Sequence, residues 1–555
     1  MKVYQWIEAC LQAYGCRQVF GVPGALVMPV WQNLNGLKLT LCGHEGEASY
    51  VATGYGKKAR ELVAVVTTGG PGVTNCVSGI AAANLDSIPL LYISGRTPIG
   101  KSETGLRQEE GTLDRNYDSS SLLRSVTKSS VVVTDLEHAP WQIEQACLLA
   151  VAGRGGSTHL SIPVDLQDKE LDELHQGALN LEALFARGKA ATTVDKEAYP
   201  QVELVRKPTL IVMGWGCWMA GAVDDVYGLA HRMGAPVVTT SKGVCCVKKD
   251  VAFLGKLGYG DNPVLEDFIR EYAPEQVLAF GTSMSEKDIS STLRKTLEGA
   301  EIHVFTQNAK ASQHHGTQWN WHETRDLKGF IRHLRTCVPL HNAQELWEAN
   351  AQCDMAQKVH FYAHMTQTDT MAKAISGLNP LLREGVTITA DAGNHLLNTA
   401  TLLTPEEHGA TLMIDDGIRA MGSGICQTVG MAMADRHRPY IAITGDGCML
   451  MNGNILHLVA REQLPVLFVV MDNGAMGRVR VGQMNTGHII ASDLGGIDFT
   501  LYGKSFGVDA HQTDTLKGFE THVKTFLADP KPTVLVLHTD PDEIPIMLKA
   551  KGVWN

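Results

Sequence analysis

The sequence lacks the features that define several large classes of protein. No apolar run approaches the roughly 20 residues of a membrane span, and the longest runs, such as residues 465–471 (PVLFVVM), have the length of a strand. Lysine and arginine (48) are outnumbered by aspartate and glutamate (59), and no basic patch or tail makes nucleic acid an expected partner. The twelve cysteines form neither a CxxC pair nor a Cys/His cluster, so neither a zinc site nor a disulfide framework is expected.

Two further absences bear on location and on cofactor. The first residues contain no long apolar segment followed by a small-residue cleavage site, so we expect a cytoplasmic protein with reduced thiols and no membrane association. No GxGxxG motif follows a strand-like run with an acidic residue at the distance that NAD binding requires. A dehydrogenase, which is an option for any doubly wound chain, therefore ranks low.

The sequence does contain a regular alternation of strand-like and helix-like segments, which predicts an α/β fold with doubly wound parallel sheets. The strand-like runs lie at residues 17–24, 62–72, 89–95, 158–165, 208–216, 235–243, 276–281, 301–305, 386–395, 439–444, 465–471 and 532–540. They divide into three predicted domains, 1–170, 195–340 and 360–555, without a detectable sequence repeat. Residues 167–199 are charged and Ala-rich and are interpreted as a linker, and residues 341–370 as a helical connection.

The most informative feature is a pair of Gly-containing turns, each directly after a strand-like run. The first is Gly445-Asp446-Gly447, and the second, after 24 intervening residues, is Asp472-Asn473-Gly474. Because ligands collect where parallel strands end, Asp446 and Asn473 are predicted to lie side by side. Their oxygen atoms and the carbonyl of Ala475 suit Mg²⁺, which prefers octahedral oxygen ligation shared with a phosphate group. Either turn alone would be an ordinary strand-to-helix turn, but the pair predicts a magnesium and diphosphate site.

The two turns resemble the diphosphate-binding signature of thiamine diphosphate enzymes, with Asp472 in place of the first Asn of a GDG…NN pattern. Four more motifs of that family follow the family order. They are His44-Glu45 ahead of Gly54-Tyr55-Gly56, the loop Thr68-Gly69-Gly70-Pro71-Gly72-Val73-Thr74-Asn75, the segment Leu85-Asp86-Ser87-Ile88-Pro89-Leu90, and the turn Gly417-Ile418-Arg419-Ala420-Met421-Gly422-Ser423-Gly424. Within the family, the chain resembles the acetolactate synthase-like enzymes.

The resemblance implies an architecture and an assembly. It implies three domains (pyrimidine-binding, central and diphosphate-binding), of which the two outer ones share a fold. It implies a homodimer or homotetramer in which thiamine diphosphate lies between the first domain of one subunit and the third domain of another, so that the active sites are at the subunit interface.

The resemblance also implies site residues. Glu45 corresponds to the carboxyl group that hydrogen-bonds the cofactor's aminopyrimidine and assists proton loss from the thiazolium carbon; taken alone, it would be an ordinary acidic residue at a helix start. Met421 corresponds to the apolar residue that holds the two cofactor rings in a folded shape, although a lone Met is more often core filler. The remaining implied cofactor contacts are Gly393, Asn394, His395, Gly422, Gly445, Asp446, Gly447, Asn473 and Met476.

Three residues of the first domain are candidates for substrate contact. Gln108 resembles the Gln of a Phe-Gln-Glu segment that lies near the reacting substrate in acetolactate synthases, with Arg107 at the Phe position. A cation at position 107 either holds a carboxylate or points to solvent, and composition does not separate these alternatives. Lys128 resembles a Lys of the same relatives, with a solvated surface Lys as the alternative.

The chain departs from the family pattern in three places. Gly482 stands where acetolactate synthases carry a bulky Trp, which favours a donor or acceptor larger than pyruvate. In the central domain, residues 281–285 and 305–307 replace the usual GxRFDDR and DID runs, so FAD is an unlikely cofactor. The adjacent His pair of pyruvate decarboxylases is missing from the first domain, and His314-His315 of the central domain is interpreted as a surface pair.

The predicted function is decarboxylation of a 2-oxo acid and transfer of the acyl carbanion to a second carbonyl compound, dependent on thiamine diphosphate and Mg²⁺. The Gln108 match and the missing His pair favour this carboligation. The alternatives are a simple 2-oxo acid decarboxylase that releases an aldehyde, and a non-catalytic member that only binds the cofactor.

Overall fold

The computed structural model describes residues 1–101, 106–108, 117–171, 179–191, 199–202, 204, 207–258, 263–285, 288–308, 319–338, 369–415 and 417–550. The pair His314-His315 and nearly all of the predicted connection at 341–370 lie outside these residues. The chain forms two compact units. The first comprises Met1–Val194, Gly417–Arg436 and Asn452–Leu464, and the second comprises Asp195–Asp416, His437–Met451 and Pro465–Asn555.

Three parallel six-stranded sheets carry the fold, as the alternating pattern predicts. The first has the strand order β2-β1-β3-β4-β6-β5, the second β12-β11-β10-β7-β8-β9, and the third β14-β13-β15-β16-β18-β17. The first and third orders become identical when each sheet is numbered from its own first strand. The central sheet differs, and its order corresponds to the dinucleotide-binding arrangement 3-2-1-4-5-6.

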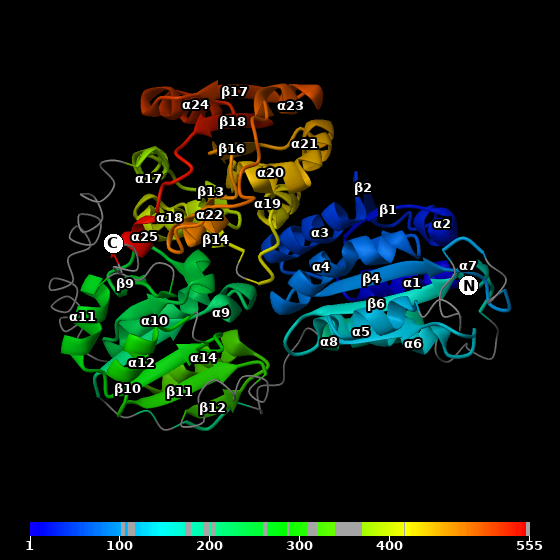
Figure 1. Ribbon diagram of the computed structural model, residues 1–555. Coiled ribbons are helices and arrows are strands. Elements are labelled where there is room, and N and C mark those ends of the chain that lie inside the picture. The colour runs from blue at the N-terminus through cyan, green and yellow to red at the C-terminus, as the bar shows by residue number, and fades with distance from the viewer. Residues whose placement is uncertain are drawn as a thin grey trace. The chain divides into compact units, whose positions relative to one another are not determined.

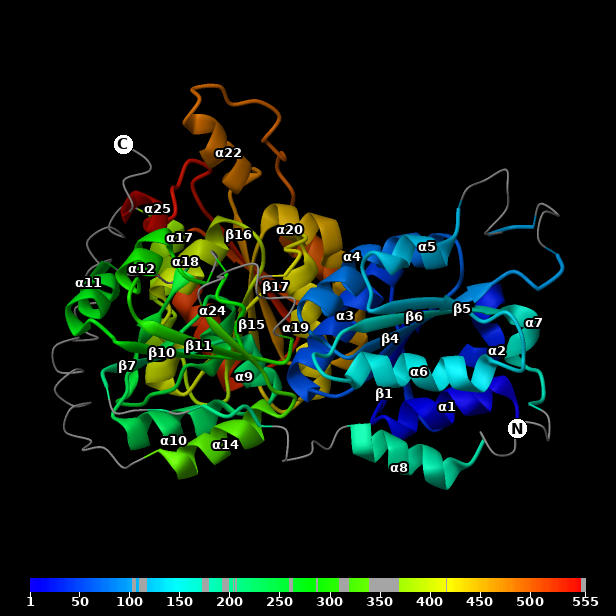
Figure 2. The ribbon, with the colours of Figure 1, turned by 90° about the horizontal axis from the view of Figure 1, so that it is seen from below.

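The first sheet has helices on both faces (Figure 2). Its strands are β1 (Gln18–Val22), β2 (Lys38–Leu41), β3 (Val63–Thr67), β4 (Leu90–Arg96), β5 (Ser129–Val132) and β6 (Ser157–Pro163). Helices α3 (Glu45–Ala59) and α4 (Pro71–Leu85) cover one face, and α1 (Val3–Ala13), α6 (Ala139–Val151) and α8 (Leu181–Ala191) cover the other. Successive strand side chains point to opposite faces, so Ala64 and Val66 of β3 join the core under α1 and α6.

Helix α8 corrects the linker interpretation of residues 167–199. Leu184 is fully buried in the same core as Trp6 and Ile143, so α8 packs on α1 and α6, the helices on this side of the first sheet. The Ala-rich composition concealed this because a single helix face with one buried Leu gives a weak periodic signal. The domain boundaries at 170, 195, 340 and 360 remain predictions.

The second unit contains the other two sheets (Figure 1). The central sheet comprises β7 (Thr209–Met213), β8 (Val237–Thr239), β9 (Phe253–Lys256), β10 (Gln276–Phe280), β11 (Glu301–Thr306) and β12 (Asn320–Glu323). The third comprises β13 (Thr387–Ala390), β14 (Thr411–Ile414), β15 (Tyr440–Gly445), β16 (Val466–Asp472), β17 (Asp509–Thr513) and β18 (Thr533–His538). The helices of the third block that matter below are α18 (Asn394–Leu402), α20 (Asp446–Asn452) and α22 (Gly477–Met484).

Helix α19 (Ser423–Ala434) follows β14 in sequence but belongs to the first unit, where it packs on α3. The approach is close and reciprocal. A Cβ atom on Gly54 of α3 would lie 1.9 Å from the Gln427 carbonyl oxygen, and one on Gly430 of α19 would lie 2.0 Å from the Val51 carbonyl oxygen. Glycine is therefore required on both helices, because any side chain would force the backbones apart.

No helix in the described ranges has the length and apolar character that crossing a bilayer would demand.

Candidate cofactor site

Asp446 begins α20 directly after β15, and Asn473 follows β16, the neighbouring strand. Their side chains converge on one backbone group, since the Ala475 N–H donates to Asp446 Oδ2 (3.1 Å) and to Asn473 Oδ1 (3.1 Å). The other Asp446 oxygen accepts from the Gly447 N–H at 2.7 Å. The structure thus brings Asp446, Asn473 and Ala475 together at the ends of the neighbouring strands β15 and β16.

The electrostatics of Asp446 fit a cation. Its side chain is 5% exposed, and burial raises its pKa to about 6, assisted by the charge of Asp472 and opposed by the backbone N–H groups of Gly447 and Ala475. A divalent cation would offset this cost of burying a charge. In the described ranges no group of three His, Cys, Asp or Glu side chains could hold a metal. The set at Asp446 has instead one carboxylate, one amide oxygen and one carbonyl, a mixed oxygen set that Mg²⁺ accepts.

Helix α18 presents its N-terminus to the same place. Gly393 precedes it with a φ of 153°, and a Cβ atom there would lie 2.5 Å from the His395 ring. A Cβ atom on Gly445 would lie 3.2 Å from the same ring, so the glycines leave space on both sides of His395. The first N–H groups of a helix have no partner within the helix and attract anions, which makes this end suitable for a diphosphate.

Two side chains at the start of α18 carry buried polar atoms that lack partners. In the described part of the chain, no hydrogen bond reaches Asn394 Oδ1, Asn394 Nδ2 or His395 Nε2, although both residues are 4% exposed. Burial lowers the pKa of His395 to about 4, so its ring is neutral at physiological pH. Unsatisfied buried groups are costly and rare, and here they fit a polar ligand. A Cβ atom on Gly477 would lie 2.6 Å from Asn473 Nδ2 and 3.3 Å from Asn394 Nδ2, so both amides face one glycine.

Met476 follows this turn, and the segment is fixed by backbone pairing. The Met476 N–H donates to the Ser492 carbonyl (2.7 Å), and the Leu494 N–H donates to the Gly474 carbonyl (2.8 Å). Met476 is partly buried and immediately precedes α22. The residues predicted to bind the diphosphate and the cation therefore all lie on three neighbouring strand ends of one sheet.

Glu45 lies in the other unit, as the first residue of α3. His44 caps this helix, with its Nδ1 accepting from the Gly46 N–H at 3.1 Å. Asn75 of α4 donates from Nδ2 to Glu45 Oε2 at 2.9 Å, and within the described residues Glu45 Oε1 accepts no hydrogen bond. One carboxyl oxygen is thus held by the protein and the other is available to a ligand.

Sequence reasoning missed Glu47, the third residue of α3. Its side chain is 1% exposed. Burial raises its pKa to about 7, although the nearby backbone N–H groups of Gly43 and His44 lower it. Glu47 stands at the spacing of a capping box, three residues after the cap His44, but neither of its carboxyl oxygens makes a hydrogen bond within the described residues. The spacing His44-x-x-Glu47 is the signal that would have identified it.

Met421 and Gly422 lie in the first unit, at the turn that leads into α19. The Met421 carbonyl accepts from Asn452 Nδ2 at 3.1 Å, and Gly422 has a φ of 79°, the left-handed region that favours glycine. Upstream in the turn, a Cβ atom on Gly417 would lie 2.7 Å from Asp86 Oδ1. The turn is therefore fixed against the buried end of α4.

Gln108 is held against the loop that follows β3. Thr68 Oγ1 donates to Gln108 Oε1 at 3.0 Å, and a Cβ atom on Gly70 would lie 3.1 Å from the Gln108 side chain. Arg107 beside it is exposed and makes no ion pair with another described residue. The Lys128 ammonium donates to the carbonyls of Ala152 (2.9 Å) and Arg154 (2.8 Å), the contacts of a structural lysine.

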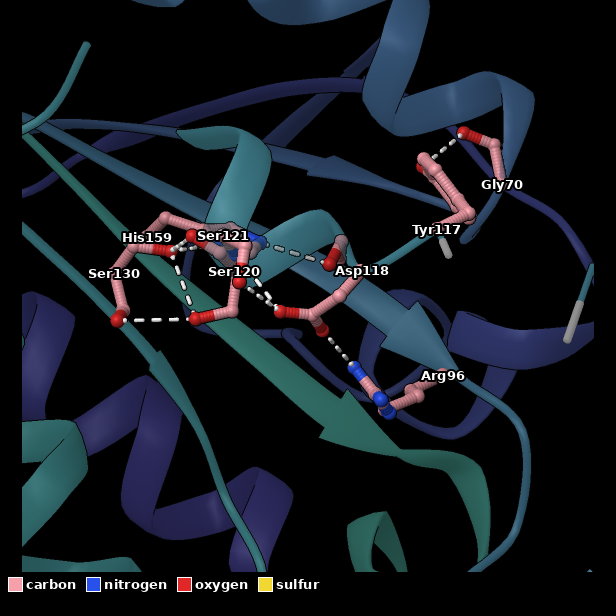
Figure 3. A network of polar contacts seen from close by, with 9 residues as sticks. Gly70, Arg96, Tyr117, Asp118, Ser120, Ser121, Ser130 and His159 are labelled. Atoms are coloured by element: carbon pink, nitrogen blue, oxygen red, sulfur yellow. Dashed lines mark hydrogen bonds and ion pairs between the residues drawn. The ribbon is translucent and has the colours of Figure 1, made fainter. Parts of the chain in front are cut away.

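A network of polar contacts supports the same loop (Figure 3). Tyr117 donates from its hydroxyl to the Gly70 carbonyl at 3.1 Å. The next residue, Asp118, accepts from Arg96 (3.1 Å) and caps α5 (Ser119–Arg124) through the Ser121 N–H (2.9 Å). Tyr117 and Asp118 thus connect the loop after β3 to β4 and α5.

The network ends in a buried histidine. His159 is fully buried, and burial lowers its pKa to about 3. Its Nδ1 lies 2.9 Å from Ser130 Oγ, and its Nε2 lies 2.9 Å from Ser94 Oγ. Tyr92 stacks on the ring at 5.1 Å and donates from its hydroxyl to the Gly72 carbonyl (3.1 Å). Tyr92 and Tyr117 thereby hold the loop after β3 at two points.

Gly482 lies on the exposed side of α22. A Cβ atom added to it would meet no atom within 4 Å. The space that a larger side chain would fill here is therefore open.

Doubly wound parallel sheets with polar side chains gathered at their strand ends define a cofactor-binding α/β protein. Comparison with protein families specifies the cofactor. Residues 1–119 match the thiamine pyrophosphate enzyme N-terminal TPP binding domain, residues 202–330 the central domain, and residues 391–537 the C-terminal TPP binding domain of that family. The three matched ranges together span more than half of the chain, and it belongs to the thiamine pyrophosphate enzymes.

Curated relatives match along the whole length. The large subunit of acetolactate synthase isozyme 2 from Escherichia coli is 27% identical, with 100% of this chain and 97% of the relative covered. A probable acetolactate synthase large subunit from Methanocaldococcus jannaschii is 24% identical, with 100% and 94% covered. The acetolactate synthase of Bacillus subtilis is 24% identical, with 90% and 86% covered.

Proposed function

We propose that this protein is a carboligase that decarboxylates a 2-oxo acid and joins the remaining acyl group to a second carbonyl compound. The observation that carries this proposal is the similarity over the full chain to relatives named acetolactate synthase. The position of Gln108 against the loop after β3, in the same unit as Glu45, supports it further.

The residues divide the work as follows. Bound thiamine diphosphate would supply a nucleophilic thiazolium carbon and a ring that takes up the electron pair left behind when CO₂ departs. Asp446, Asn473 and the Ala475 carbonyl would hold Mg²⁺, and the N-terminus of α18 would bind the diphosphate. Glu45, fixed by Asn75, would hold a proton at the far ring nitrogen of the aminopyrimidine.

Substrate handling falls to other groups. Gln108, whose amide is partly occupied by Thr68, would orient the substrate carbonyl, and the exposed Arg107 would attract its carboxylate. The open space at Gly482 favours a donor or acceptor larger than pyruvate. In the assembly that the family resemblance implies, the Glu45 region of one subunit and the Asp446 region of another would act on one cofactor.

A product assay tests the proposal. The protein is incubated with thiamine diphosphate, Mg²⁺ and a panel of short and long 2-oxo acids, with and without aldehyde or ketone acceptors, and products are identified by mass spectrometry. We expect masses that join donor and acceptor with loss of CO₂. Free aldehydes alone would replace the carboligase by a decarboxylase, and absence of turnover despite bound cofactor would favour a non-catalytic member.

A substitution at Gly482 tests the preference for a substrate larger than pyruvate. Gly482→Trp fills the open space, so we expect it to shift the preference between a long 2-oxo acid and pyruvate toward pyruvate by about tenfold in kcat/KM, the scale of a steric change in a pocket. Gly496→Ala, another site with no atom near the added Cβ, is the control and should leave the ratio unchanged. An unchanged ratio in Gly482→Trp would contradict the role of this position.

A further inference from the structure

Lys256 connects the central sheet to the helix that carries the diphosphate-binding end. It is the last residue of β9, and its ammonium donates to the carbonyls of Ala400 (2.7 Å) and Leu403 (2.6 Å), both at the C-terminal end of α18. Both contacts are buried, and the residue is 9% exposed. A side chain of the central sheet therefore caps the C-terminal end of α18, a helix of the third block.

This contact satisfies a specific need of the helix. The last carbonyls of a helix have no partner within it and carry partial negative charge, which a cation stabilises. Asn379 completes the end, because its Nδ2 donates to the Leu402 carbonyl (2.9 Å) and its Oδ1 accepts from the Thr404 N–H (2.9 Å). Four backbone groups between Ala400 and Thr404 are thus fixed by side chains from outside the helix.

Burying the Lys256 ammonium costs free energy, so its place at the end of α18 requires a structural reason. Burial lowers the pKa of Lys256, and among the described residues the charge of Glu406, itself 2% exposed, counteracts this. A buried cation is expensive unless hydrogen bonds and opposite charge compensate it. An apolar residue would fill the same place without this cost but would leave the α18 carbonyls unpaired.

The opposite end of α18 is the end that matters for the cofactor. Gly393, Asn394 and His395 lie there, and α18 is only nine residues long. A shift of its last turn therefore moves its first turn, since a short helix behaves as a rigid rod. We propose that Lys256 is a positioning residue through which the central domain sets the diphosphate-binding end of α18. The inference rests on the proposed function, which assigns that end to the diphosphate.

The experiment compares two variants of the same strand in the full-length protein. Lys256→Met removes the ammonium, and Leu254→Ala, at a 1% exposed core residue two positions earlier on β9, weakens the central domain but keeps the hydrogen bonds of Lys256 to the end of α18. Thiamine diphosphate affinity with Mg²⁺ is measured by calorimetry, alongside the thermal midpoint of each protein. We expect at least tenfold weaker affinity in Lys256→Met, an affinity within twofold of the wild type in Leu254→Ala, and substantial recovery in Lys256→Arg.

The possible results separate a positioning role of Lys256 from a general stabilising role. Equal losses of affinity in Lys256→Met and Leu254→Ala, at similar loss of thermal stability, would overturn the proposal and leave a general stabilising role. If Lys256→Met does not fold, Lys256→Gln is held to the same comparison with Leu254→Ala, with a threefold or greater loss of affinity expected. A wild-type protein that binds no thiamine diphosphate would overturn the proposed function instead, and normal wild-type binding with unchanged variants would overturn only the role of Lys256.

Discussion

The first and third sheets have the same strand order, so each turn at a strand end in one has a counterpart in the other. After the third strand of each sheet, the first has Thr68 to Gly70, which packs against Gln108, and the third has Gly445 to Gly447, which places Asp446. After the second strand, the first sheet leads to Glu45 and α3, and the third leads to Met421 and α19.

The two frameworks thus carry different chemistry at equivalent places. One offers a carboxyl group at a helix start and an amide held against a glycine loop. The other offers a carboxylate, an amide oxygen and an open helix N-terminus. The two sheets therefore provide the same framework, and the residues in the turns at the strand ends determine the function of each.

The strongest test of this division is Glu45→Gln. The variant keeps the shape of the side chain and the contact with Asn75 but cannot hold the proton in the same way. We expect turnover to fall by about 100-fold or more, the scale of a lost general acid–base group, with cofactor still bound. Turnover and cofactor content are measured together. Full activity in this variant would refute the proposed role of the first sheet.

Asp446→Ala is the matching change in the third sheet. Because it removes the only carboxylate of the proposed cation site, we expect the Mg²⁺ dependence and the retention of thiamine diphosphate to be lost together, by about 10- to 100-fold in affinity. Cofactor is quantified after gel filtration with and without a chelator. Cofactor retention equal to that of Glu45→Gln would mean that the two sheets do not divide the work.

Gly54→Ala and Gly430→Ala test the close contact between α3 and α19, the helices that follow the second strand of each sheet. Each added methyl group would lie about 2 Å from a carbonyl oxygen of the opposite helix, so overpacking should cost about 2–3 kcal/mol. Differential scanning calorimetry should show a thermal midpoint lower by roughly 5 °C or more. Gly496→Ala, which meets no atom, should change the midpoint little. Unaltered midpoints in both helix variants would contradict the close packing.

A smaller effect is expected from Glu47→Gln, which has no counterpart in α19. The pKa of Glu47 is about 7 in the folded protein and near 4.5 when unfolded, so its stabilising effect is complete below pH 4.5 and is lost as the pH rises through 7. Glutamine keeps the size and removes the ionisation. We expect Glu47→Gln to raise stability at pH 8 by about 1–2 kcal/mol and to have little effect at pH 5.

Thermal midpoints at the two pH values measure this difference. Glu47→Asp, which keeps the ionisable group, serves as the control and should retain the pH dependence of the wild type. A midpoint difference that is the same at pH 5 and pH 8 in Glu47→Gln would show that ionisation of this group plays no part.

The strands that the sequence predicts are the four interior strands of each sheet. Interior strands of parallel sheets are buried on both faces and form continuous apolar runs, as in Val466–Asp472. The six strands that it does not predict, β2, β5, β9, β12, β14 and β17, are the edge strands. Most of them are short and partly exposed, as β12 is, so their sequences resemble loops.

The residues of the candidate site also fall into those that the sequence predicts and those that it does not. Turns with glycine and a polar residue after an apolar run are local signals, so Asp446, Asn473 and Gly393 can be found from sequence. Contacts between distant segments leave no such signal. Lys57 of α3, for example, pairs in the core with Asp86 and donates to Gln427, and Lys256 reaches α18 across 144 residues of sequence. Neither lysine is marked in the sequence by a neighbouring partner, and only the folded chain shows the groups that it contacts.

Two serine hydroxyls flank the buried His159 ring, Ser130 Oγ at 2.9 Å from Nδ1 and Ser94 Oγ at 2.9 Å from Nε2. With its pKa near 3, this ring stays neutral throughout the range in which exposed histidines titrate. In an NMR titration, the His159 signals would stay fixed while those of His138 move, so His159 provides a pH-independent reference signal within the protein.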